Sequence, residues 1–135
     1  MNFQISDTPV DDTTHVIELG GEIDLYTAPE FKERMVELIE QGKHNLVIDL
    51  SGATFIDSTT LGVLVGGVKR LRPAGGGMAL VCTDSSISKI FEITGLDRVF
   101  PIHDSRDEAI AASPALMAAR RRRKRASPGR PSTAV

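Results

Sequence analysis

The 135-residue sequence predicts an α/β fold in which helices pack on a mostly parallel or mixed sheet. Short apolar segments typical of strands alternate along the chain with longer segments in which apolar residues recur at helical spacing. Glycine, proline and small hydroxyl residues separate these segments and mark the turns. The length and an apolar content of 41% suit one domain with a single hydrophobic core.

The N-terminal part predicts two strands followed by a helix. The strands are expected at residues 3–6 and 15–19. Thr27 is expected to cap the helix, with Glu30 completing a capping box, and Gly42 is expected to stop it. The buried face is expected to contain Phe31, Met35, Leu38 and Ile39, which recur at i, i+4, i+7 and i+8.

The middle of the chain predicts a central strand and a second helix. Residues 46–50 are apolar on both faces except at Asp49, as expected for a central strand. A short turn and the apolar pair 55–56 lead to a helix over about residues 59–72, which ends before Pro73. Its expected apolar stripe is Leu61, Leu64, Val65, Val68 and Leu71.

The C-terminal part predicts a strand, a helix, a short edge strand and a last helix. Three glycines turn the chain into the strand, and Gly95 is expected to stop the first of these helices. Pro101 restricts the following strand to an edge of the sheet. The expected ranges are 78–83 and 84–95 for the first pair, then 99–102 and 107–117 for the second.

The net charge of −2 combines two unlike parts. Residues 120–135 contain seven basic groups and no acid, which leaves nine basic and eighteen acidic groups in the first 119 residues. An acidic body makes direct nucleic-acid binding by the folded domain unexpected. The basic segment is expected to be a disordered tail; contact with nucleic acid, acidic lipid or an acidic partner, or a kinase site at Ser127, are the alternatives.

The sequence predicts a cytoplasmic location for the protein. Its one cysteine, Cys82, lies in an apolar stretch and is expected to be a small buried residue in a reducing compartment. The N-terminus lacks the layout of a secretory signal, and no apolar run approaches the roughly 20 residues that span a bilayer. No membrane association is therefore expected.

The sequence does not predict an enzyme. It contains no nucleophile–base–acid set, no Walker loop and no G-x-G-x-x-G motif. His15, His44 and His103 are isolated and lack metal-ligand spacing, so they are expected at the surface or at strand ends. Neither a cofactor nor a metal is expected.

The segment Asp-Ser-Thr-Thr at residues 57–60 is the candidate functional site. It lies at the start of a helix, where unpaired backbone N–H groups favour an anion or a phosphate. Its hydroxyls are either structural caps or a phosphorylation switch. Gly62, Gly66 and Gly67 weaken the helix that follows and leave its backbone open to a partner.

Asp24 is a second candidate because it closes the segment Gly-Gly-Glu-Ile-Asp at a strand end. The carboxyl ends of parallel strands share one edge of a sheet, so Asp24 is expected to lie near Ser58. The alternative is that Asp24 serves as a helix cap or a turn acid.

Five segments together resemble the STAS domain of bacterial anti-sigma factor antagonists, over about residues 3–112. They are Gly-Gly-Glu-Ile-Asp24, Val-Ile-Asp-Leu-Ser51, Phe-Ile-Asp57-Ser58-Thr59, Leu-Gly-Val-Leu-Val-Gly66 and Ile-Phe-Glu-Ile-Thr-Gly95-Leu96. The resemblance implies one STAS-like domain at residues 1–117, with a four- to five-stranded mixed sheet and about four helices, before the tail at 118–135. It implies a protein that binds an anti-sigma factor with serine/threonine kinase activity and so releases a sigma factor. That kinase would phosphorylate the antagonist, and a phosphatase would reverse the modification.

Carried over by position, the phosphoacceptor is Ser58, with Thr59 as the second candidate. Thr60 stands where many members have glycine, which would place a β-branched side chain at the partner-facing start of the helix and alter the choice of kinase. The protein is expected to be a monomer or a weak dimer. The residues expected beside the phosphosite are Asp24, Asp57 and Thr60, and those expected to bind the partner are Thr59, Leu61, Gly62, Val63 and Gly66.

Two other functions stay open on the sequence. One is a non-switching STAS subunit of a larger sensory or transporter-associated complex. The other is a phosphotransfer or nucleotide-hydrolysing enzyme, which the missing motifs disfavour.

Overall fold

The two N-terminal apolar segments pair as an antiparallel hairpin in the computed structural model, which describes residues 2–112 of the chain. Strands β1 (Phe3–Pro9) and β2 (Thr14–Ile23) flank a turn held by Asp11. One carboxylate oxygen of Asp11 accepts the backbone N–H groups of Thr13 and Thr14 at 2.9 and 2.8 Å. A short polar side chain therefore fixes the register of the first pair.

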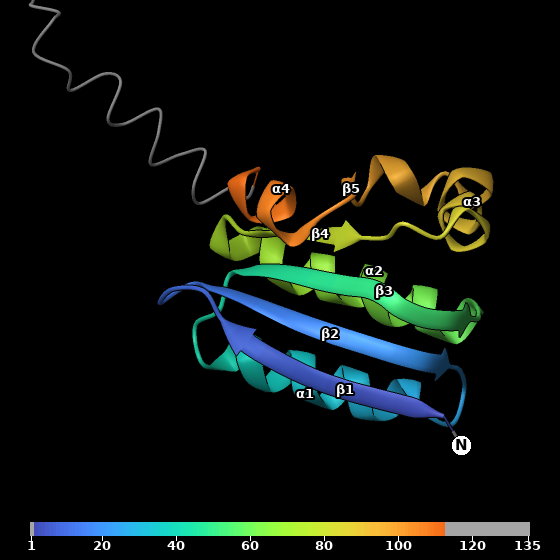
Figure 1. Cartoon of the computed structure of the whole chain (residues 1–135). Helices are drawn as coiled ribbons and strands as arrows, with labels where there is room; N and C mark the ends of the chain where they lie inside the picture. Colours follow the sequence, from blue (N-terminus) through green and yellow to red (C-terminus); the bar gives the residue numbers. More distant parts are fainter. Residues whose placement is uncertain (1, 113–135) are drawn as a thin grey trace, which may run out of the picture.

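The five described strands form one mixed sheet in the order β1-β2-β3-β4-β5, in which only the β1–β2 pair is antiparallel. This confirms the predicted fold class (Figure 1). The remaining strands are β3 (Asn45–Ile56), β4 (Gly77–Val81) and β5 (Ile102–His103). The helices are α1 (Ala28–Glu40), α2 (Ser58–Leu71), α3 (Ser85–Thr94) and α4 (Arg106–Ala111), with 3₁₀ turns at Arg72–Ala74 and Leu96–Arg98.

Helices α1, α2 and α3 bury their apolar faces against one side of the sheet, and α4 packs on the other side. Phe31, Leu64 and Phe91, one from each of the three helices, are fully buried in the main core. A smaller cluster on the opposite face joins Ala109 of α4 to valines and an alanine of the central strands. The sheet is therefore covered over its full width on one side and over β3, β4 and β5 on the other.

Strand β3 is longer than predicted. The expected turn after residue 50 is wrong, because the strand continues to Ile56 alongside β2. The pairing survives through two register shifts, one between Glu18 and Gly20 and one between Gly21 and Glu22. The long strand places the start of α2 at the far end of the sheet from the β1–β2 turn.

The predicted capping box of α1 is also wrong. Thr27 makes no side-chain cap; its hydroxyl donates to the Glu22 carbonyl at 3.0 Å and accepts the Asp24 N–H at 2.8 Å. The carboxylate of Asp24 instead accepts the N–H groups of Tyr26 and Thr27. Asp24 is thus the turn acid that organises the β2–α1 loop, and Glu30 plays no part in the cap.

The C-terminal elements are shorter than expected. Residues 99 and 100 are not in a strand, because Phe100 turns into the core and packs edge-on against Phe91 at 6.2 Å between ring centroids. Helix α4 ends at Ala111, and Pro114 lies two residues beyond its cap, where proline is common. The helix predicted over 113–117 and the tail at 118–135 lie outside the described residues.

Burial distinguishes the two alternatives for one histidine and confirms the cysteine. His15 lies near the start of β2, as the strand-end alternative expects, and is buried there; its Nε2 lies 2.7 Å from Asp7 of β1, and Arg34 of α1 pairs with the same carboxylate. Cys82 is buried, as predicted. Within residues 2–112, no helix is long and apolar enough to cross a membrane, and no group of three or more potential ligands could hold a metal ion.

Candidate functional site

Asp57 caps α2 and ties it to the loop after β2. The chain leaves β3 at Ile56, and Asp57 adopts an extended conformation before the helix begins at Ser58. Its Oδ1 accepts the Thr60 N–H at 3.1 Å, which satisfies one unpaired donor of the first turn. Its Oδ2 accepts the Leu25 N–H at 3.1 Å. One carboxylate therefore fixes both the helix start and the neighbouring loop.

Thr60 is a structural residue. Its side chain is 0% exposed, and its hydroxyl donates to the Ile23 carbonyl at 2.8 Å. Thr60 lies one helical turn before the buried Leu64, on the inward face of α2. The expectation that Thr60 presents its side chain to a partner is therefore wrong.

Ser58 is exposed at the first position of α2. Among residues 2–112 its hydroxyl has no hydrogen-bond partner, and Asp57 rather than a hydroxyl caps the helix. The reading of Ser58 as a structural cap is therefore wrong. The backbone N–H groups of Ser58 and Thr59 are the unpaired donors of this first turn, so a negative group on Ser58 would meet the positive end of the helix.

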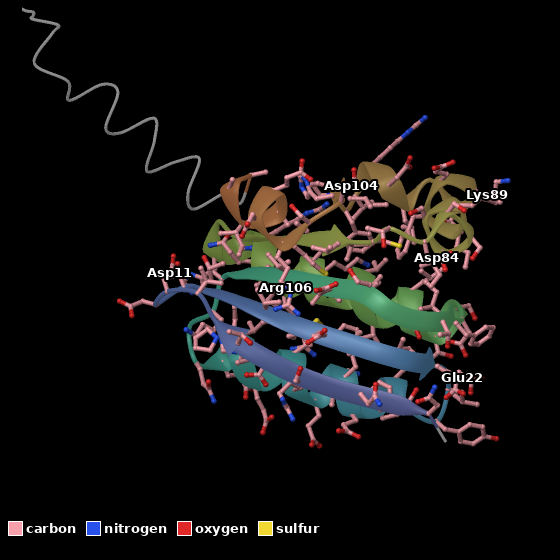
Figure 2. All side chains as sticks on the ribbon, in the orientation of Figure 1. Asp11, Glu22, Asp84, Lys89, Asp104 and Arg106 are labelled. Carbon is pink, nitrogen blue, oxygen red and sulfur yellow. The ribbon has the colours of Figure 1, made fainter. Side chains whose placement is uncertain are left out.

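Asp24 and Ser58 belong to segments that meet at one edge of the sheet. The contacts of Asp57 with Leu25 and of Thr60 with Ile23 join the β2–α1 loop to the start of α2. Figure 2 shows Glu22 and Asp84 at this end of the molecule and Asp11 at the other. The parallel strand order thus brings the two loops together, as the sequence predicts.

This edge is acidic. Glu22 and Asp84 are exposed, and Asp24 and Asp57 are half-buried. Asp84 caps α3, and hydrogen bonds from the Ser86 hydroxyl and N–H groups lower the pKa of its carboxyl. A phosphate on Ser58 would therefore add negative charge to a surface that already carries several carboxylates.

The glycines of α2 differ in their surroundings. A methyl group at Gly62 or Gly66 would meet no atom within 4 Å, whereas one at Gly67 would lie 2.6 Å from Met35 Sδ and 2.7 Å from Met78 Cε. Gly67 therefore serves internal packing. Four predicted partner residues line a hollow of about 240 Å³ between α1 and α2: Thr59, Gly62, Val63 and Gly66. The fifth, Leu61, is not among its lining residues; it is partly buried against the core, as Val63 is.

An apolar rim beside Ser58 was missed at the level of sequence. It comprises Leu25, Tyr26 and Phe55, which are 60%, 77% and 49% exposed. The Leu25 N–H donates to Asp57, and Phe55 is the penultimate residue of β3, opposite Glu22. Exposed apolar side chains gathered at one place are typical of protein–protein interfaces. The available signal was the apolar pair 25–26, which follows an acid at a strand end and precedes a helix.

Comparison with known proteins assigns the chain to a family. A family model of the STAS domain matches residues 6–109. An anti-sigma-B factor antagonist from Staphylococcus epidermidis is 32% identical over 104 residues, which cover 77% of this chain and 95% of that protein. The crystal structure of an anti-sigma factor antagonist from Mycobacterium paratuberculosis aligns with a TM-score of 0.75 and 28% identity, covering 82% and 92% of the two chains.

A third relative is known in a modified state. The phosphorylated form of the Bacillus cell fate determinant SpoIIAA aligns with a TM-score of 0.63 and 26% identity, covering 80% of this chain and 96% of that one. The family model covers most of the described residues, and the sequence relatives match over nearly their full length. The chain belongs to the STAS domain family, and the relatives that it resembles in both sequence and fold are anti-sigma factor antagonists.

Proposed function

We propose that this protein binds an anti-sigma factor, so that a sigma factor is released, and that phosphorylation of Ser58 switches the binding off. The observation that carries the proposal is the exposed Ser58 at the start of α2, which has no capping role because Asp57 caps the helix. The anti-sigma factor would also be the serine/threonine kinase, and a phosphatase would restore the unmodified form. A phosphorylated state of the relative SpoIIAA supports the switch.

The proposed contact surface consists of Ser58, the apolar rim and the hollow beside Gly62 and Gly66. Exposed apolar side chains would supply most of the binding free energy. The open backbone at Gly62 and Gly66 would allow the partner to approach α2 closely. This surface needs binding and no chemical turnover by the protein itself.

The charge of the edge explains how one phosphate would act. Phosphorylation adds about −1.5 to −2 charges at neutral pH. The positive end of α2 tolerates this charge, so the fold is kept. In a complex, the phosphate would be desolvated next to Asp24 and Asp57, which costs several kcal/mol. Since about 1.4 kcal/mol is a factor of ten in affinity, such a cost abolishes a micromolar complex.

The first test is to map phosphorylation on protein isolated from its own host, by intact mass and peptide fragmentation. We expect one phosphate on Ser58, at an occupancy that changes with growth conditions. Ser58→Ala should bind the anti-sigma factor without being phosphorylated. Ser58→Asp should bind at least tenfold more weakly, with an unchanged melting temperature.

Ser85→Asp is the matched control, because Ser85 is the exposed first residue of α3 and follows the capping Asp84. It should bind like the wild type. If Ser58→Asp and Ser85→Asp weakened binding equally, the total charge of the edge would be responsible rather than Ser58. No phosphate together with full binding by Ser58→Asp would favour the non-switching subunit.

A further inference from the structure

A second pocket lies at the end of the sheet opposite Ser58. Its volume is about 200 Å³, and it opens between the first residues of β3 and β4, the C-terminal half of α2 and the end of α4. Strand β3 has 12 residues, so its two ends are roughly 36 Å apart at about 3.3 Å per residue. The pocket is therefore remote from Ser58, the residue proposed to switch binding of the anti-sigma factor.

The lining of the pocket is mainly apolar and therefore favours an apolar occupant. Val68, Met78 and Val99 are among its lining residues. The lining also includes Asn45, which is buried, and His103; Asn45 Oδ1 and His103 Nε2 are buried without hydrogen-bond partners among the described residues. An unpaired buried acceptor is costly, so a backbone N–H donor near Asn45 would stabilise the site.

The chain itself arrives at this pocket. Ala112, the last described residue, lines it. The next seven residues are Ser-Pro-Ala-Leu-Met-Ala-Ala, the only apolar stretch between α4 and the basic run that begins at Arg120. In the sequence, Pro114 disfavours a continuation of α4 through Ser113. We propose that Leu116 and Met117 occupy this pocket.

The length of chain between Ala112 and Leu116 and the volume of the pocket both suit Leu116 and Met117 as its occupants. Leu116 is four positions after Ala112 in the sequence, and four residue steps span at most about 14 Å when extended. For scale, an apolar cavity of about 150 Å³ holds a benzene molecule, so this pocket holds one or two aliphatic side chains. The segment also brings backbone N–H groups, the kind of donor that Asn45 Oδ1 lacks.

Docking of this segment would fix where the basic run starts. Arg120 would then leave the domain at the end of the sheet opposite Ser58. The basic run and the phosphorylation switch would be spatially separate, so changes in the docked segment would leave binding at the Ser58 edge unchanged.

Methyl NMR on the full-length chain tests the proposal directly. We expect nuclear Overhauser effects from the Leu116 and Met117 methyl groups to those of Val68, Met78 or Val99. Leu116→Asp combined with Met117→Asp should abolish them and lower the melting temperature by about 3–6 °C, through loss of apolar burial. Ala118→Asp combined with Ala119→Asp adds the same charge to the same segment and should change the melting temperature by less than about 1 °C.

The absence of these Overhauser effects in the wild type would overturn the proposal. So would equal melting temperatures for the two double variants. Nuclear Overhauser effects seen only between differently labelled molecules would also overturn the proposal, because a second copy of the chain would then fill the pocket.

Discussion

The hydroxyl of Thr60 donates a hydrogen bond to the main-chain carbonyl of Ile23, 37 residues earlier in the chain, at 2.8 Å. Ser58, two positions before Thr60 on the same helix, is exposed and has no such partner among residues 2–112. The first turn of α2 thus combines two roles: Thr60 holds α2 to the end of β2, and Ser58 is left available for modification. Neighbouring hydroxyls should therefore respond differently to mutation.

Thr60→Val should lower the free energy of unfolding by about 1–3 kcal/mol, because the buried Ile23 carbonyl loses its donor while the volume of the side chain is kept. Thr59→Val is the matched control and should change it by less than about 0.5 kcal/mol, since Thr59 is only half-buried. Urea denaturation of both variants measures the difference. Equal stabilities would mean that the long-range hydrogen bond contributes nothing net.

Replacing an open glycine of α2 by alanine should stabilise the fold and weaken binding of the anti-sigma factor. Gly62→Ala should raise the free energy of unfolding by about 0.5–1 kcal/mol, because alanine is the better helix former and the new methyl meets no atom within 4 Å. The same methyl should weaken binding of the anti-sigma factor by blocking close approach to the backbone.

Gly67→Ala is the internal comparison for this prediction. Its methyl would approach the ends of Met35 and Met78, both buried, so the gain in helix propensity should be offset by repacking. Chemical denaturation and a binding isotherm for each variant give the two quantities. Unchanged affinity in Gly62→Ala would remove this part of α2 from the proposed contact surface.

The apolar rim should supply much of the binding free energy. Tyr26→Ala and Phe55→Ala should each weaken the complex about tenfold or more, which corresponds to about 1.4 kcal/mol, with little change in melting temperature. Val10→Ala is the control, because Val10 is also exposed but lies in the β1–β2 turn at the opposite end of the sheet. Titration calorimetry with the anti-sigma factor distinguishes them. Equal losses in all three variants would argue against a localised interface.

Local signals predicted most elements of the fold. Apolar spacing located α1 and α2, and the turn chemistry of Asp84 and Gly95 marked the two ends of α3 correctly. The failures arose where a distant partner outweighed a local signal. The segment at residues 51–52 resembles a turn, yet it stays in β3 because β2 pairs beside it. Phe100 leaves the predicted edge strand because the core has a place for its ring.

The candidate site was predicted in position but not in orientation. An acid followed by hydroxyls after a buried strand was enough to place Ser58 at the start of a helix. The inward direction of Thr60 depends on the Ile23 carbonyl, and the apolar rim depends on two loops meeting; neither relationship has a signal along the chain. The same holds for the pairing of Asp49 with Arg106, 57 residues later.

Asp49 is a carboxylate within β3 that anchors α4 to the sheet. Its Oδ2 accepts a hydrogen bond from Arg106 Nε at 2.6 Å, and its Oδ1 accepts the Ser51 N–H at 2.9 Å. Burial alone would raise the pKa of Asp49, but hydrogen bonds from Ser51 and Arg106 outweigh it and hold the pKa below the ordinary value of 3.8. Glu18, half-exposed, also faces Arg106 at 3.1 Å and adds little.

A lowered pKa in the folded state means that the Asp49 charge stabilises the fold above pH 3.8, and that this contribution is lost as the pH falls below 3.8. Arg106→Gln should therefore lower the free energy of unfolding by about 1–3 kcal/mol at pH 7 and by clearly less at pH 3. Arg98→Gln, which changes an exposed arginine of the 3₁₀ turn before β5, should have little effect at either pH. Urea denaturation of the three proteins at both pH values gives the comparison. A loss in Arg106→Gln of the same size at pH 3 as at pH 7 would show that Arg106 acts through packing rather than through the charge of Asp49, because the carboxylate is increasingly protonated at the lower pH.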